Sequence, residues 1–496
     1  MVPVPIVRLG LLCALLQLAG CRSGQTDKGV FVSLSDSGFV IGDQPFFPLV
    51  MNYSVDLLTD GSTIWPAVNK SYFPDGKYPC SDPTECLRML RAEFALIAQQ
   101  GFNAVRIVNL AEGPKAYDGT GVPQLKLWRT NGTDTVVPFQ NETIRKAYVQ
   151  AVRTTLSAAA QEGLRVIPLT TIHHDQPWTL ENFVLMADAL RNDTAVLAFD
   201  LFNEPLYFDT PPRSKEAVHD IVNGWRKIAR RHAPHHLITI GLTGIRETHA
   251  WDPNILDVDF ISFHPYEYEP DQVLNEIRWY GEHVDAPWII GETSLPADGD
   301  SVSYADQARF AQRTLDQVRA CGGIGYSWWQ FKDVRWGRFH SDYMGVMKLE
   351  GRTTMPQGYV DVVGVEKPVA EVFRKFDPRS PVPAAVELPN YLNYSQHRTS
   401  RISGRLVDRV GVPIEGGVVL GWNEDFSHSY HTISKNDGTF VLYGDLYFHH
   451  WIASANGYDM VRGDCDPTGF RRAADGVPDF DLGRLDLGVP RFVVEH

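Results

Sequence analysis

Residues 196–205 read Val-Leu-Ala-Phe-Asp-Leu-Phe-Asn-Glu-Pro, a short apolar run that ends in an Asn-Glu-Pro triplet. A continuous run of this kind is typical of a parallel strand that is buried on both faces. A second run, residues 288–291, is followed in the same way by the acidic residue Glu292. The sequence therefore places a carboxylate directly after each of two predicted strands.

Six further runs of this kind lie along the chain, and longer helical stretches separate most of them. The predicted strands are 46–51, 104–108, 165–169, 196–202, 237–241, 260–263, 288–291 and 324–329. The predicted helices are 85–100, 142–162, 214–231, 271–283, 304–320 and 368–376. Eight strand–helix units over about 350 residues predict an α/β fold, a (β/α)8 TIM barrel. A doubly wound open sheet is the alternative, but no Gly-rich phosphate-binding fingerprint follows the first strand.

The composition is that of a folded globular protein. The 496 residues are 44% hydrophobic and 21% charged, which excludes wholesale disorder, collagen-like structure and coiled coil. A net charge of −14 argues against a nucleic-acid partner, which needs a basic surface. Six cysteines in this length exclude a disulfide scaffold, and the absence of a Cys-x-x-Cys motif leaves structural zinc without support. We expect no metal and no cofactor.

The N-terminus is predicted to be an export signal. Its apolar run, residues 9–16, is too short to span a bilayer as a helix and resembles the core of a secretory signal peptide. The following Leu18-Ala19-Gly20-Cys21 resembles a bacterial lipobox, in which Cys21 is lipidated; an ordinary signal peptide is the alternative. We therefore expect residues 1–20 to be removed, residues 21–29 to form a tether, and a lipid anchor to hold the protein in the cell envelope, at the outer membrane or cell surface.

A linker and a second domain are predicted after the barrel. The barrel would span residues 30–376, and residues 377–399 are rich in Pro, Ser and Asn, as in linkers. Residues 400–496 contain short strands and turns that predict a small all-β sandwich, and they resemble carboxypeptidase-regulatory-like domains. We expect this sandwich to be a spacer or a packing module. The alternative is glycan binding through Trp422, Tyr430 or Trp451.

Export would also permit a disulfide. Cys80 and Cys86 flank a turn-like spacer, and a bridge between them would pin a surface loop; two free thiols are the alternative. Three connections after strands are long, residues 52–84, 109–140 and 331–366, and their aromatic content favours ordered loops.

The order of motifs along residues 30–376 resembles the clan A retaining glycoside hydrolases, closest to family 5. The matching elements are Phe102-Asn103-Ala104-Val105-Arg106, a His after the third strand, Asn203-Glu204-Pro205, Ser262-Phe263-His264-Pro265-Tyr266, Gly291-Glu292 and Trp329-Gln330-Phe331. The resemblance implies that Glu204 is the acid/base and Glu292 the nucleophile. It further implies that Asn203 holds the sugar 2-hydroxyl and that Trp329 lies under the sugar at subsite −1.

Physical chemistry gives these residues distinct requirements. Glu204 needs a raised pKa in order to be protonated at neutral pH, so it should be desolvated. Glu292 must stay ionised, which the cation of Arg106 and a hydrogen bond from Tyr266 would favour. Taken alone, Arg106 could equally be a structural ion-pair partner, and His264 a hydrogen-bonded core residue.

Two pairs of neighbours leave a choice, because adjacent side chains of an extended segment point in opposite directions. At most one of His173 and His174 faces the site, and we choose His173 as the substrate-binding residue. Of Trp328 and Trp329, we expect Trp328 in the core and Trp329 at the site.

Together these features predict a retaining β-glycosidase that hydrolyses a β-linked polysaccharide or oligosaccharide, such as mannan or β-glucan, by double displacement. Its partner would be a carbohydrate substrate. One alternative is a surface protein that binds glycans without cutting them. Another is a transglycosylase that uses the same residues.

Overall fold

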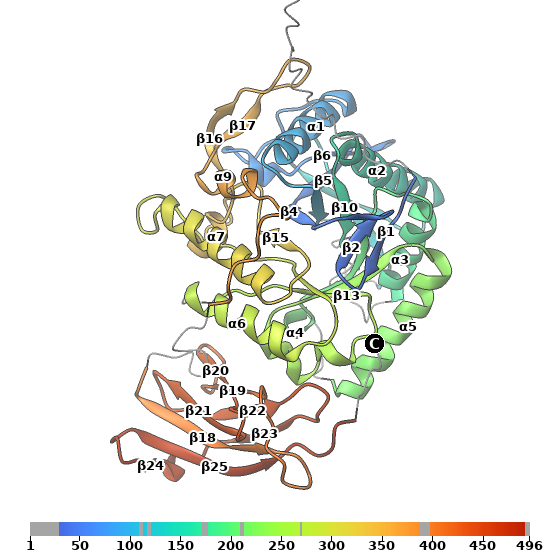
Figure 1. Ribbon diagram of the computed structural model, residues 1–496. Coiled ribbons are helices and arrows are strands. Elements are labelled where there is room, and N and C mark those ends of the chain that lie inside the picture. Colours follow the sequence, from blue (N-terminus) through green and yellow to red (C-terminus); the bar gives the residue numbers. More distant parts are fainter. Residues whose placement is uncertain are drawn as a thin grey trace, which may run out of the picture.

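The computed structural model describes residues 29–108, 113–116, 121–170, 177–208, 213–267, 270–386 and 397–491 (Figure 1). An antiparallel sheet of β1 (Val32–Ser35), β2 (Gly38–Ile41) and β3 (Gln44–Pro45) precedes the barrel. Phe39 of this sheet packs edge-on against Phe260, at a ring-centroid distance of 5.0 Å. Since Phe260 begins a barrel strand, this small sheet covers the end of the barrel where the strands start.

An eight-stranded parallel sheet forms the centre of the molecule, in the order β10-β7-β4-β15-β14-β13-β12-β11. Its strands are β4 (Leu49–Tyr53), β7 (Ala104–Ile107), β10 (Arg165–Pro168), β11 (Ala198–Asn203), β12 (Leu237–Leu242), β13 (Phe260–Phe263), β14 (Trp288–Ile290) and β15 (Tyr326–Trp328). Parallel bridges Val166↔Val196 and Leu169↔Asp200 join the two ends of this order and close the barrel. The predicted (β/α)8 fold is confirmed, with each strand within a few residues of its expected position.

Helices surround the barrel on its outer side. They are α1 (Pro83–Gln99), α2 (Glu142–Gln161), α3 (Pro177–Leu190), α5 (Lys215–His232), α6 (Pro270–His283), α7 (Tyr304–Ala320) and α9 (Val369–Arg374). Several begin at a residue whose side chain accepts backbone N–H groups of the first turn, as Asp82 does from Thr84 and Glu85. Helix α3 was not predicted, because its central residues are apolar without a clear three- and four-residue spacing.

The long connections contain strands that the sequence analysis expected only as ordered loops. The first two supply the sheet β6-β5-β8-β9, from β5 (Val55–Thr59), β6 (Ile64–Val68), β8 (Gln124–Trp128) and β9 (Asp134–Pro138). The third contains the hairpin of β16 (Met347–Thr353) and β17 (Val362–Glu366). Strands β6 and β9 each contain a proline, a residue that argues against a strand when only sequence is available. Cys80 and Cys86 are joined in a disulfide at the start of α1.

The C-terminal region is a sandwich of two four-stranded sheets, as predicted. One sheet has the order β21-β18-β25-β24, from β18 (Ser400–Val407), β21 (Thr439–Gly444), β24 (Arg471–Arg472) and β25 (Pro478–Asp486). The other has the order β20-β19-β22-β23, from β19 (Val418–Trp422), β20 (Ser429–Ile433), β22 (His450–Ser454) and β23 (Val461–Asp464). Trp451 is buried in the core of this sandwich.

The sandwich packs directly on the barrel, on the side of α6 (Figure 1). Val418 and Ile433 belong to the same hydrophobic cluster as the barrel core. The Trp279 indole N–H donates to the Gly416 carbonyl at 2.9 Å. These contacts show that the sandwich is packed against the barrel. In the part of the chain that the structure describes, no helix combines the length and apolarity needed to cross a membrane.

Candidate active site

The carboxyl ends of β7, β11, β13 and β14 bring six of the predicted residues together. Arg106 lies within β7, Asn203 ends β11 and Glu204 follows it, His264 and Tyr266 follow β13, and Glu292 follows β14. This is the end of the barrel where (β/α)8 enzymes build their active sites.

The guanidinium of Arg106 is the hub of the cluster, and the residue is only 1% exposed. Its Nε donates to Asp200 Oδ2 at 2.7 Å, and one terminal nitrogen donates to Glu292 Oε1 at 2.5 Å. The same nitrogen donates to Asn52 Oδ1 at 3.0 Å, and the other donates to Asn203 Oδ1 at 2.7 Å. A planar fork with five donors can hold four acceptors in one plane, which an ammonium group cannot.

Glu292 is buried in a polar cage. The Tyr266 hydroxyl donates to its Oε2 at 3.2 Å, while Arg106 holds its Oε1. Burial raises the pKa of Glu292, and the positive charge of Arg106 opposes that rise. The salt bridge and the hydroxyl therefore favour the ionised form that a nucleophilic carboxylate needs.

Glu204 occupies a different environment. Its backbone has a φ of 48°, which is uncommon for a residue with a side chain, and its N–H donates to the Gly241 carbonyl at 2.8 Å. Burial raises the pKa of Glu204 to about 7, and the charges of Arg106 and Arg246 oppose the rise. Two carboxyl groups whose surroundings differ in this way can act as acid and nucleophile at one pH.

His264 lies between the two carboxyl groups. Its Nδ1 is 3.0 Å from Glu204 Oε1 and 3.6 Å from Glu292 Oε1, and burial lowers the pKa of this imidazole to about 4. The ring fits because its neighbours are glycines: a Cβ on Gly241 would be 2.7 Å from the ring and one on Gly291 would be 2.8 Å from Nε2. A neutral imidazole can form a hydrogen bond with Glu204 without adding a charge to the site.

The closest ligand atoms of Glu204, His264 and Glu292 all lie within 4.8 Å of one another. Three such atoms can hold a metal ion, but the fixed charge of Arg106 already lies 2.5 Å from Glu292 and would repel a cation there. The trio suits chemistry between two carboxyl groups better than it suits metal binding.

The two neighbouring tryptophans differ in burial. Trp328 is completely buried, and its indole N–H donates to the Met344 carbonyl at 3.1 Å. Trp329 is partly exposed, and its backbone N–H donates to the Thr293 carbonyl at 3.1 Å, next to Glu292. The backbone of Trp329 thus lies next to the segment that carries Glu292, and the contact of its ring with a sugar stays a prediction. His173 and Cys21 lie outside the described residues.

Two partners of Arg106 were missed by the sequence analysis. Asn52 lies in β4 and donates to the Gly291 and Trp328 carbonyls at 2.9 and 3.1 Å, and Asp200 lies in the middle of β11. Asp200 carried a signal, because it is a charged residue inside an otherwise apolar strand and buried charges need partners. Asn52 follows its predicted strand directly, a position that also favours the site.

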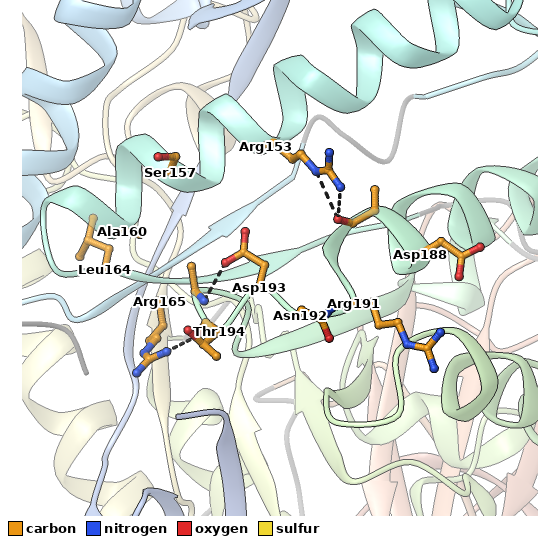
Figure 2. A pocket seen from close by; sticks show the side chains of 12 residues that line it. Arg153, Ser157, Ala160, Leu164, Arg165, Asp188, Arg191, Asn192, Asp193 and Thr194 are labelled. Carbon is orange, nitrogen blue, oxygen red and sulfur yellow. Dashed lines mark hydrogen bonds between the residues drawn. The ribbon is translucent and has the colours of Figure 1, made fainter. Parts of the chain in front are cut away.

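A separate surface hollow of about 630 Å³ lies at the other end of the barrel (Figure 2). It is lined by the second half of α2, the end of α3 and the segment that leads into β11. Arg153 and Arg165 turn toward the carbonyls of Ala189 and Thr194, so both guanidinium groups are engaged by the backbone. This hollow faces away from the carboxyl ends of the strands and takes no part in the site.

Comparisons with known proteins point to a family of glycoside hydrolases. The family model described as cellulase (glycosyl hydrolase family 5) matches residues 86–334, half of the chain. Among solved structures, GH5_18 from Streptomyces cattleya in complex with GlcNAc is 16% identical with a TM-score of 0.48, over 74% of this chain and 85% of that chain. The exo-beta-1,4-mannosidase Op5Man5 from Opitutaceae bacterium strain TAV5 is 18% identical with a TM-score of 0.45, over 69% of this chain and 61% of that chain.

No curated protein matches the chain by sequence. The family match covers α1 through the eighth barrel strand and includes every residue of the cluster except Asn52. The chain therefore belongs to glycosyl hydrolase family 5 and is a glycoside hydrolase.

Proposed function

We propose that the protein is a retaining β-glycosidase with Glu292 as nucleophile and Glu204 as acid/base. One observation supports this most directly: the nearest oxygens of the two carboxyl groups lie within 4.8 Å of each other. Retaining enzymes place these groups about 5–5.5 Å apart, whereas inverting enzymes need about 6.5–9.5 Å to admit a water molecule.

In the first step, a Glu292 oxygen attacks the anomeric carbon while the Glu204 carboxyl gives its proton to the departing glycosidic oxygen. The C–O bond to the leaving group breaks, and a glycosyl ester of Glu292 forms. In the second step, the Glu204 carboxylate takes a proton from water, the water oxygen attacks the anomeric carbon, and Glu292 leaves as a carboxylate. Asn203, held by Arg106, would bind the 2-hydroxyl, and Trp329 would lie under the sugar.

For the substrate, we propose a β-linked glycan, with β-glucan and mannan as the first candidates. The test is reducing-sugar release from β-glucan, β-mannan, xylan and galactan by the wild type, by Glu292→Gln and by Glu424→Gln, an exposed control on the sandwich. We expect release from one polymer, its loss in Glu292→Gln and no change in Glu424→Gln. Binding without release by the wild type would contradict the proposal in favour of a glycan-binding protein.

The stereochemistry of the first product formed separates retention from inversion. With the polymer that is cleaved, proton NMR should show the β-anomer first. Products longer than the substrate when an acceptor sugar is added would instead identify a transglycosylase, which uses the same two carboxyl groups.

We also propose that the protein is exported and anchored through a lipid on Cys21. The lipobox-like segment supports this, as does the Cys80–Cys86 disulfide, a bond that persists in oxidising compartments. We expect labelled palmitate to enter the wild type but not Cys21→Ser when each is expressed in a bacterium. Equal labelling of both proteins would contradict the anchor.

A further inference from the structure

A short 3₁₀ helix, η3 (Ile245–His249), follows β12 and lies beside the turn that carries Glu204. Its central acidic residue, Glu247, is only 1% exposed. One oxygen of this carboxyl, Oε1, accepts the backbone N–H of Leu206 at 3.1 Å and that of Thr243 at 3.3 Å. A single buried carboxyl therefore joins the segment after β11 to the segment after β12.

The turn that Glu247 holds has an unusual backbone. Glu204 has a φ of 48°, a value that non-glycine residues keep only where the surroundings enforce it. Pro205 has no N–H, so the three residues from Glu204 to Leu206 offer two backbone donors. The Glu204 N–H is bound by Gly241 and the Leu206 N–H by Glu247. Removing Glu247 leaves one half of this turn without its hydrogen bond.

The neutral, protonated form of Glu247 fits its position beside Glu204. Burial raises the pKa of Glu247 to about 8, and the negative charge of Glu204 adds to the rise. A neutral carboxylic acid accepts the two N–H groups without placing a second negative charge beside the acid/base. An amide side chain of the same shape offers the same accepting oxygen.

The sandwich lies behind η3. Strands β19 and β22 pack against this helix, and His249 Nε2 lies 3.4 Å from the Val418 carbonyl oxygen. Ile245 and Val418 are both completely buried and belong to the same hydrophobic cluster. The helix is thus enclosed between the acid/base turn on one side and the C-terminal domain on the other.

We propose that Glu247 is a positioning residue for Glu204, and that the sandwich holds η3 against the acid/base turn. The C-terminal domain then forms part of the support of the catalytic acid. This inference rests on the proposed function of Glu204, and Glu247 itself touches no reacting atom.

The test uses two aryl β-glycosides of the sugar that the wild type hydrolyses, one with a phenol and one with a 2,4-dinitrophenol leaving group. Phenol must be protonated as it leaves, whereas dinitrophenol needs no proton, so a misplaced acid slows the first substrate selectively. Since proton transfer contributes about 10²–10⁴-fold, we expect Glu247→Ala to lower kcat/KM at least about 10-fold on the phenyl glycoside and about 2-fold or less on the dinitrophenyl glycoside. Glu247→Gln should stay within about 3-fold of the wild type on both, because its amide oxygen still accepts.

Equal losses on the two substrates, or no loss on either, would overturn the role of Glu247. Crystal structures of both variants provide a second test, which does not depend on enzyme activity. We expect the Glu204–Leu206 turn to move in Glu247→Ala and to keep its wild-type position in Glu247→Gln, and an unmoved turn in the alanine variant would overturn the inference. If the turn moves but the wild type has no glycosidase activity, the proposed function is refuted, while the role of Glu247 in holding the Glu204–Leu206 turn is retained.

The contribution of the sandwich is tested by Val418→Ala beside η3. Asn456→Ala is the control, because its side chain bonds the His283 carbonyl elsewhere in the same interface. We expect Val418→Ala to lower kcat/KM about 3-fold or more on the phenyl glycoside and to leave kcat/KM on the dinitrophenyl glycoside unchanged. Asn456→Ala should leave the ratio of the two kcat/KM values unchanged. If neither variant changes the ratio of kcat/KM between the two glycosides, the part of the inference that concerns the sandwich is overturned.

Discussion

At the scale of single residues, Arg106 has to neutralise two buried carboxylates at once. Asp200 is completely buried and Glu292 is 6% exposed, and both receive a hydrogen bond from the guanidinium. Breaking a buried pair by removing one partner is costly, because a charge remains in the interior without compensation. The residue thus serves both the stability of the barrel and the ionisation of Glu292.

Replacing this guanidinium should therefore reduce both stability and activity. We expect Arg106→Met to lower the free energy of unfolding by about 3–5 kcal/mol, measured by urea titration. Arg374→Met is the matched control, since Arg374 is 38% exposed and its ion pair with Glu366 lies at the surface; we expect a change below about 1 kcal/mol. Similar losses in the two variants would contradict the buried role of Arg106.

Glu204 should set the alkaline limb of the pH profile. The proposed acid works when protonated, and its pKa is about 7, so the protonated fraction declines as the pH rises through that value. We expect kcat/KM on an aryl glycoside with a poor leaving group to fall about tenfold per pH unit above this pKa. The same measurement with a dinitrophenyl leaving group should show a much weaker alkaline limb; identical limbs would assign this ionisation to a group other than the acid.

Much of the site is readable from the sequence at this scale. Glu204, Glu292, Asn203, His264 and Tyr266 lie together because each comes at or just after the carboxyl end of a barrel strand. The partners of Arg106 were not predicted, since Asn52 is 54 positions from it along the chain and the two residues meet only because β4 pairs with β7 in this register. Glu247 was missed as well, because nothing in a loop sequence indicates which backbone N–H a carboxyl will accept.

At the scale of elements, the strand ends must leave room for His264. A Cβ on Gly291 would lie 1.8 Å from Ser262 Oγ and 2.8 Å from His264 Nε2. Both neighbours belong to the β13 segment, which hydrogen-bonds to β14 through Ser262 and Ile289. Only a residue without a side chain allows this register to carry the imidazole between the carboxyl groups.

Gly291→Ala should therefore damage the site through overpacking. We expect the variant to lose about 1–3 kcal/mol of stability and most of its activity, because the ring of His264 has to shift. Adding Ser262→Ala removes the closest clash, so stability should recover in part while activity stays low. Gly224→Ala, in the middle of α5 with no neighbour within 4 Å, is the control and should be neutral or stabilising. Thermal unfolding and kcat measure both effects, and full activity in Gly291→Ala would contradict the packing argument.

The barrel strands were predictable because burial on both faces makes each one a continuous apolar run. The strands in the long connections were not predicted, because β6 and β9 contain a proline and β5 contains the charged residue Asp56, so none of the three is a continuous apolar run. Their sheet also depends on a pairing between segments that are distant in the sequence. Strand β5, for example, is paired with β8 through Leu58 and Trp128, which lie in two different connections.

At the scale of the whole molecule, the barrel and the sandwich share buried contacts. Lys215 Nζ, at the start of α5, donates to Asp252 Oδ2 at 2.9 Å and to the Ala455 carbonyl of the sandwich at 2.7 Å. Asp252 in turn accepts the Gly457 N–H at 2.6 Å. Both ionic side chains are 3% exposed or less, so this pair links the two domains in a region without solvent.

The two domains should consequently unfold together. We expect calorimetry to record one transition for the wild type. Lys215→Met leaves Asp252 buried without its cation, and we expect this variant to lose about 3–5 kcal/mol in that same transition. Lys146→Met, whose ion pair with Glu142 is 75% and 80% exposed, is the control and should change stability by less than about 1 kcal/mol. Two separate transitions in the wild type would show that the interface does not couple the domains.

The barrel, the following sandwich and the two carboxylates could be predicted from local patterns: apolar runs, turn residues and the residue that ends each strand. The four contacts of Arg106, the place of His264 between two glycines and the packing of the sandwich against η3 could not be predicted in this way. Those features join residues that are far apart in the sequence. Their partners are fixed by the closure of the barrel and the docking of the second domain, which no local pattern specifies.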